Sequence, residues 1–152
     1  MPVYHIMFVN RSNSLIFDHS FNESDNSIHK SFREKGSDDA IRMASYLSGF
    51  TARIKEISPN HEAETGLQLI EGYDQNLHCY RTATHNTIVA ISDPKTTDLR
   101  YLFNALHKAF VEHVVNHPNF VTDHSGAAMT VKSTDFPVFT SNVAQAVERY
   151  GR

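Results

Sequence analysis

Short apolar segments recur along the chain and predict five β-strands. Residues 3–9 and 88–91 are almost continuously apolar, which is typical of interior strands in a sheet that is covered on both faces. Leu15, Phe17 and Phe21 are expected on one side of the segment 15–21 and Asp18 and Ser20 on the other, so this strand is expected nearer the edge of the sheet. The predicted strands are residues 3–9, 15–21, 65–72, 77–82 and 87–92.

Longer segments repeat apolar residues at steps of three and four, which predicts helices over residues 37–57, 98–116 and 137–150. The apolar stripe of the first helix comprises Ala40, Met43, Ala44, Leu47, Phe50, Ile54 and Ile57. The second stripe comprises Leu99, Leu102, Phe103, Leu106, Phe110 and Val114. The third comprises Phe136, Phe139, Val143, Ala146, Val147 and Tyr150. Ser37 and Thr97 are candidate N-caps, and Pro118 ends the second helix.

The element order is therefore ββαβββαα, which predicts an α/β (α+β) fold. A five-stranded, mostly antiparallel sheet would carry one helix on one face and the two final helices on the other, because neither apolar face can stay in water. Residues 22–36 are polar and without pattern, so they are expected to form a loop. The length of 152 residues suits one domain spanning 1–152.

Composition narrows the function classes. The formal charge of −3 comes without a clustered basic footprint, which argues against nucleic-acid binding. The only cysteine cannot form an internal disulfide, so a reducing compartment is expected. No window approaches the 18 to 20 apolar residues of a transmembrane helix, and residues 3–9 are too short for a signal peptide. These features predict a cytosolic protein.

No candidate chemistry is strong, so no catalytic, cofactor or metal residue is assigned. Cys79 and His78 are neighbours on a predicted strand and point to opposite faces, which favours a buried structural thiol over a nucleophile. His113 and His117 have the four-residue spacing of a metal pair, but spacing indicates no third ligand. The six glycines form no phosphate-binding loop.

The first helix carries the most useful anomaly, a flank of uncharged and mostly small residues beside its core stripe. Small side chains allow another element to approach closely, and Arg and Tyr on the opposite flank are common at interface hot spots. A solvated flank is the alternative interpretation. The candidate subunit-interface residues are Ile41, Arg42, Ser45, Tyr46, Ser48, Ala52 and Arg53.

Several short motifs, in this order along the chain, resemble one family. They include Val3 to Arg11, Gly66 to Glu71, Leu77-His78-Cys79-Tyr80-Arg81-Thr82, Ser92-Asp93-Pro94 and Asn116 to Phe120. Together they resemble the small subunits of the TRAPP tethering complex, in the sedlin/synbindin group. The Leu-His-Cys run and the Asp-Pro stop place the resemblance nearest to synbindin without its PDZ-like insertion.

The resemblance implies a longin-like three-layer fold and a role as a structural subunit of a vesicle tether in ER-to-Golgi transport. Such a complex promotes guanine-nucleotide exchange on a Rab-family GTPase through a composite surface, so this chain would not be an enzyme by itself. The implied partners are other TRAPP small subunits and, through the assembled complex, the Rab GTPase. The implied location is cytoplasmic and peripheral to Golgi and ER–Golgi membranes.

Two features depart from the family pattern. Thr84-His85-Asn86 replaces the usual Thr-Gly of the turn between the paired strands, and residues 22–36 are too short for the insertion. The alternative is a longin domain of another trafficking protein, such as an R-SNARE regulatory head or an adaptor small chain. A small enzyme that uses its histidines is the third class considered.

Overall fold

The computed structural model describes residues 3–11, 14–21, 37–57, 68–83, 86–96, 98–118, 120, 122 and 136–150. Within 37–57, the side chains of residues 37–41, 48, 51, 52, 54 and 55 are not part of the description. The predicted loop at 22–36 lies outside the described residues.

Five strands form one antiparallel sheet in the order β2-β1-β5-β4-β3. Their bounds are β1 Val3–Val9, β2 Leu15–Ser20, β3 Leu69–Glu71, β4 Asn76–Arg81 and β5 Thr87–Ser92. The two continuously apolar segments are the interior strands β1 and β5, as their sequence predicts. Thr82 N–H donates to the Asn86 carbonyl at 2.8 Å, so the β4–β5 hairpin closes despite its unusual turn sequence.

The two edge strands differ from their predictions. Within the described part of the predicted strand 65–72, only Leu69–Glu71 is extended, and all three residues are exposed. In β2, a bulge opposite Phe8 and Val9 inserts one extra residue. The prediction that Leu15 and Phe17 share a face is therefore wrong: Phe17 packs against α3 and α4, whereas Leu15 packs beside Met7 on the other face.

The helices are α2 Ser37–Ile57, α3 Arg100–Phe110 and α4 Pro137–Tyr150. A π-helical turn, η1 Val111–Val115, continues α3, so the two together confirm the predicted second helix. The N-cap of α3 is Leu99, which makes no side-chain cap hydrogen bond; just before the helix, Asp98 Oδ1 accepts a hydrogen bond from the backbone N–H of Arg100 at 3.0 Å. Thr97, the predicted cap, lies outside the described residues.

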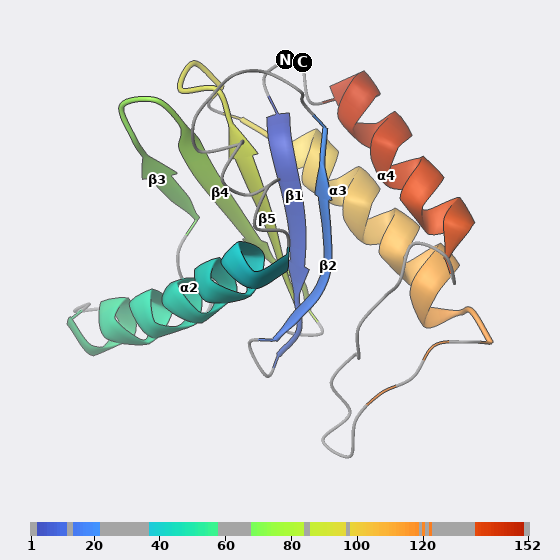
Figure 1. The fold of residues 1–152 in the computed structure, drawn as a ribbon, viewed down its shortest axis with the longest axis horizontal. Coiled ribbons are helices and arrows are strands. Elements are labelled where there is room, and N and C mark those ends of the chain that lie inside the picture. The colour runs from blue at the N-terminus through green and yellow to red at the C-terminus, as the bar shows by residue number, and fades with distance from the viewer. Residues whose placement is uncertain are drawn as a thin grey trace.

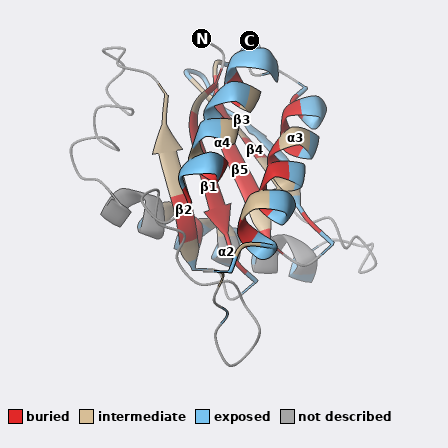
Figure 2. Cartoon of the chain, turned by 90° about the vertical axis from the view of Figure 1, so that its right-hand side faces the viewer, coloured by how far each residue is buried: buried red, intermediate tan, exposed pale blue. Residues whose placement is uncertain are grey.

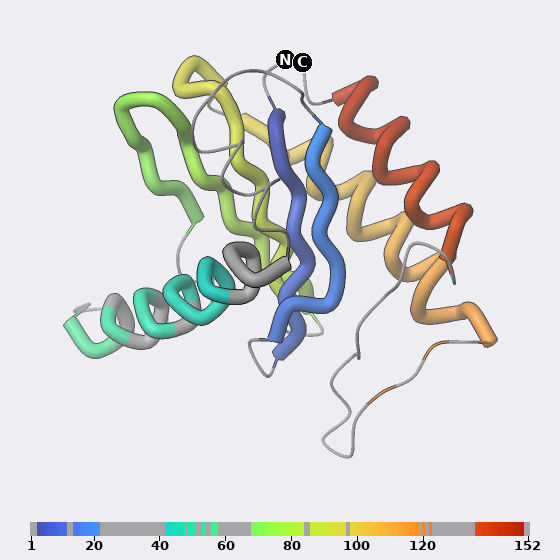
Figure 3. The backbone as a smooth tube through the Cα atoms, in the orientation of Figure 1, coloured from blue at the N-terminus to red at the C-terminus, as the bar shows by residue number. Residues whose placement is uncertain are grey.

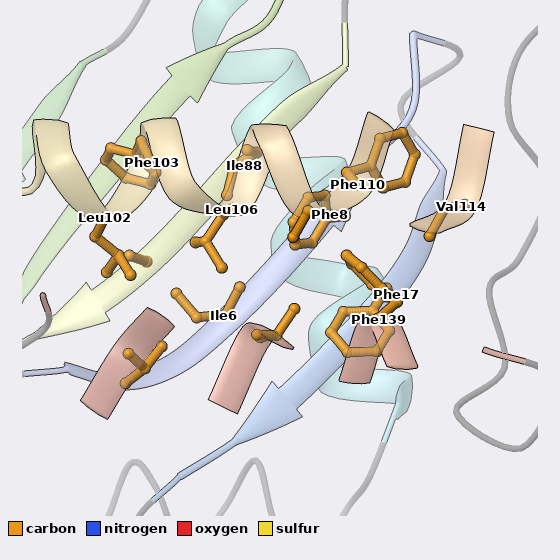
Figure 4. Packing of buried hydrophobic residues seen from close by; sticks show 14 of the residues in the cluster. Ile6, Phe8, Phe17, Ile88, Leu102, Phe103, Leu106, Phe110, Val114 and Phe139 are labelled. Atoms are coloured by element: carbon orange, nitrogen blue, oxygen red, sulfur yellow. The ribbon is translucent and has the colours of Figure 1, made fainter. Parts of the chain in front are cut away.

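The sheet lies between α2 on one face and the α3–α4 pair on the other, which confirms the three predicted layers and the longin-like arrangement (Figure 1). The larger core fills the α3–α4 side. There Phe8 stacks on Phe110 with ring centroids 5.4 Å apart and meets Phe139 edge-on at 5.5 Å (Figure 4). Both helices turn their buried residues to the sheet and their exposed residues outward (Figure 2).

Every residue of the second apolar stripe is buried, as predicted. The third stripe is confirmed at Phe136, Phe139, Val143 and Val147, whereas Tyr150 is exposed. The first stripe is confirmed at Met43, Ala44 and Leu47, whereas the side chains of Ala40 and Ile54 lie outside the described residues.

Candidate interaction surface

The N-terminal half of α2 covers the second face of the sheet. Ala44 is buried, and Met43 and Leu47 pack against a small core made of Met7, Val89 and Ile91. These contacts repeat at three- and four-residue steps, so one side of the helix is fixed on the strands.

The C-terminal half of α2 extends away from the strands (Figure 3). Phe50 is 54% exposed and Ile57 is 82% exposed, so the prediction that these two residues belong to the core is wrong. The periodic pattern was present, but the sheet ends before the helix does, and these side chains have no strand beneath them. Apolar residues at a helical spacing that the chain itself leaves uncovered are typical of a surface that meets another protein.

The structure places four of the seven predicted interface residues at the surface. Arg42, Ser45, Tyr46 and Arg53 are exposed, and the Tyr46 side chain is 73% accessible. Arg53 Nη1 lies 3.5 Å from Glu56 Oε2, in an exposed pair that contributes little stability. The side chains of Ile41, Ser48 and Ala52 lie outside the described residues.

A hollow of about 570 Å³ opens on the other face of the sheet, between the β3–β4 edge and the start of α3. Tyr80 and Phe103 stack in its wall with ring centroids 5.5 Å apart. Asp98 and Arg100 form a two-pronged ion pair at the same site, with Nη2 to Oδ2 at 2.9 Å. Sequence reasoning did not identify this hollow, because its walls come from two strands and a helix start that are far apart in the chain.

His78, Ser92 and Asp98 are the residue types of a nucleophilic triad, but their arrangement is structural. His78 Nε2 lies 2.9 Å from Ser92 Oγ, and the serine hydroxyl also donates to the Asp93 carbonyl at 3.2 Å. Ser92 has no exposed surface, so no substrate could reach its hydroxyl. Burial lowers the pKa of His78, while the Thr96 carbonyl and Asp98 act in the opposite direction.

Cys79 is held as an unreactive thiol. It packs beside Leu77 on the α2 face, whereas His78 points to the opposite face, as the strand register predicts. Burial raises the Cys79 pKa to about 12, so the nucleophilic thiolate is scarce at neutral pH. The half-buried thiol is therefore a packing residue.

The paired histidines of the second helix do not complete a metal site in the described structure. His113 lies 3.9 Å from Glu112 Oε2, and His117 packs edge-on against Phe136 with ring centroids 4.9 Å apart. Among the described residues, no three side chains of metal-ligand type come together. No described helix combines the length and the apolar character needed to cross a membrane.

The chain is similar in sequence to several known proteins. The model of the Sybindin-like family matches residues 3–150. "Trafficking protein particle complex subunit 4" of Dictyostelium discoideum is 24% identical over 118 residues, which cover 78% of this chain and 82% of that protein. The human protein of the same name is 23% identical over 82 residues, covering 54% of this chain and 37% of that protein.

Part of the chain is also similar to solved structures. "Myxococcus xanthus MglB" aligns with a TM-score of 0.41 and 20% identity, covering 62% of this chain and 68% of that chain.

Proposed function

This chain belongs to the Sybindin-like family, and on that premise we propose that it is a structural subunit of a trafficking-particle tethering complex. The relatives from Dictyostelium discoideum and human carry that complex in their names. In this role the chain acts by binding neighbouring subunits, as a single domain over residues 1–152, and not by chemistry of its own.

The main support for the proposal is that α2 leaves large apolar side chains exposed. A 21-residue helix uses Met43, Ala44 and Leu47 to cover the sheet and leaves Tyr46, Phe50 and Ile57 exposed. Large apolar side chains with arginines at their border match the composition of protein–protein interfaces. We therefore assign the α2 surface, made of Ile41, Arg42, Ser45, Tyr46, Ser48, Ala52 and Arg53, to contact with a sister subunit, and Phe50 extends it.

A finer role is proposed by analogy with the family. We propose that the assembled complex acts in ER-to-Golgi transport, at the cytoplasmic side of those membranes, and that this chain contributes to a composite surface for nucleotide exchange on a Rab GTPase. The buried Ser92 and the high pKa of Cys79 support a role without catalysis by this chain alone.

The direct test begins with affinity purification of the full chain from its source cells and identification of the stoichiometric companions. The companion subunit is then titrated with wild type and with Tyr46→Ala. Removal of a central aromatic anchor is expected to weaken the affinity by about tenfold, or about 1.4 kcal/mol. Ser48→Arg should have a similar effect, because a long charged side chain would keep the two surfaces apart.

Tyr101→Ala is the matched control. Tyr101 has the same 73% exposure as Tyr46 but lies on α3, on the other side of the sheet. The proposal fails if Tyr46→Ala and Tyr101→Ala bind the companion equally well, or if the chain purifies without companions.

A further inference from the structure

The β3–β4 turn presents an aromatic side chain almost entirely to solvent. Tyr73 is 97% exposed at the tip of the hairpin, so its ring contributes no burial to this fold. The turn lies at the end of the sheet away from α2 (Figure 1). A contact made through Tyr73 would therefore use a different surface from the one assigned to the sister subunit above.

The tip is held in one shape. Gly72 N–H donates to the Gln75 carbonyl at 2.9 Å and closes the turn. At the base of the hairpin, the buried Asn76 side chain donates to the carbonyls of Pro94 and Thr96, each at 3.1 Å. Because the backbone beneath Tyr73 is already fixed, docking this ring would cost little conformational entropy.

Turn chemistry does not account for the tyrosine. Tight turns favour Gly, Asn, Asp, Ser and Pro, which supply the required backbone conformations or local hydrogen bonds. Gly72 and Asp74 fit that pattern, whereas Tyr73 adds a large apolar surface that the turn does not need. Tyrosine is enriched at interface hot spots, because it offers a large rigid surface with few rotatable bonds.

The charges around the ring define the partner. Glu71 and Asp74 flank Tyr73, both are exposed, and neither forms an ion pair within the described part of the chain. The adjacent 93–96 loop carries Asp93 and Lys95, whose opposite charges leave the acidic character of the tip in place. A complementary surface therefore has an apolar hollow bordered by lysine or arginine.

We propose that the Tyr73 hairpin tip is a second protein-docking element, which inserts its ring into a basic-rimmed apolar pocket on another protein. Glu71 and Asp74 pair with the rim and set the orientation of the contact. With α2 binding at one end of the sheet and the tip at the other, the domain bridges two neighbours. The docking element does not depend on the identity of the α2 partner.

Photo-crosslinking identifies the partner. The full chain with Tyr73→p-benzoylphenylalanine is irradiated in its source cells, beside a control chain with the same substitution at Tyr101. The expected result is a protein adduct specific to position 73, with the crosslinked peptide at an apolar pocket bordered by Lys or Arg. The proposal is overturned if position 73 gives no protein adduct, gives only lipid adducts, or gives the same adducts as position 101.

The purified adduct partner is then titrated with the full chain. Tyr73→Ala should weaken binding by about tenfold, Tyr73→Phe should retain most of it, and Tyr101→Ala should leave it unchanged. Asp74→Lys should weaken binding and reduce its dependence on salt. Equal affinities of wild type and Tyr73→Ala would overturn the proposal.

The α2 variant separates this result from the proposed function. Tyr46→Ala should leave the position-73 adduct intact, because the two elements lie at opposite ends of the sheet. If the chain binds no companion through α2 but still forms the Tyr73 adduct, the proposed function fails and the docking element stands. If it binds the companion but forms no Tyr73 adduct, the docking element fails and the proposed function stands.

Discussion

At the scale of single residues, the core between the sheet and α3 is the part of the molecule most sensitive to substitution. Leu106 has no exposed surface and lies among the large aromatic and aliphatic side chains of that core (Figure 4). Leu106→Ala is expected to lower the free energy of unfolding by about 2 to 5 kcal/mol, because the lost methyl groups leave a cavity. Urea denaturation measures the change.

Lys108→Ala is the control for that variant, since its side chain is exposed on the outer side of the same helix. It should change the stability by no more than about 0.5 kcal/mol. Similar losses in the two variants would contradict the assignment of the stripe to the core.

His78 links stability to pH at the same scale. Burial lowers its pKa in the folded protein, so the folded state holds the neutral ring while the unfolded state takes up a proton first on acidification. The stability associated with the neutral ring is therefore present above about pH 6.5, the ordinary value, and is lost as the pH falls below it.

The expected result is that His78→Gln loses less stability than wild type between pH 7.5 and pH 5.5, measured by urea denaturation at each pH. Leu106→Ala serves as the comparison, because it lowers stability without removing a titrating group. If the stability of His78→Gln changes with pH as steeply as that of wild type, His78 is not held neutral in the folded protein.

At the scale of elements, two glycines in different settings should respond to the same substitution with opposite signs. A Cβ on Gly72 would lie 2.5 Å from the Gln75 carbonyl oxygen, which closes the β3–β4 turn, so Gly72→Ala must displace backbone and destabilise the hairpin. Gly49 is exposed within α2 and a Cβ there meets nothing within 4 Å. Gly49→Ala should stabilise the protein by about 0.5 to 1 kcal/mol, because alanine is the better helix former.

Thermal unfolding of the two variants beside wild type gives both signs in one experiment. A stabilised Gly72→Ala protein would contradict the turn geometry, and a destabilised Gly49→Ala protein would contradict an uncovered helix face at that position.

Some features of the strands and helices could be predicted from the sequence and others could not. The continuous apolar runs of β1 and β5 and the stripe of α3 were predictable, because each residue's environment is set by its own strand or helix period. The bulge at Ile16 was not, since it depends on how β2 is matched to β1. The periodicity of α2 predicts that Phe50 is buried. Phe50 is exposed because the sheet is too narrow to place a strand beneath it, and the helix period carries no information about the width of the sheet.

The residues of the candidate site likewise include some that the sequence predicts and some that it does not. Tyr46 and Arg53 are predicted as border residues of α2 and are exposed, whereas Tyr73 is not among the residues that the sequence predicts at an interface. The hollow beside Tyr80 and Phe103 joins segments from β4 and α3, and no local period encodes that meeting. The family resemblance carried by the Leu77–Thr82 motif was confirmed by the family match.

At the scale of the whole molecule, the proposed role implies that exchange activity belongs to the assembly and not to this chain alone. If exchange is composite as proposed, the purified chain alone should leave the rate of GDP release from the Rab GTPase unchanged, because it would supply only part of the contact surface. The complex assembled from the purified companions should accelerate release when this chain is present and lose most of that acceleration when it is left out. Release of a fluorescent GDP analogue measures all three rates.

Acceleration by the isolated chain would contradict a composite surface. A complex that exchanges equally well without the chain would contradict its contribution to that surface, although other structural roles in the assembly would still hold.

The mass of the particle in which the chain resides shows directly whether it is a subunit of a larger complex. Native extract of the source cells is separated by sedimentation velocity or size-exclusion chromatography with light scattering, and the chain is followed by antibody. We expect the chain to migrate in a hetero-oligomer much heavier than its own 17.2 kDa, with companions in fixed stoichiometry. Migration as a 17.2 kDa species without companions would contradict it.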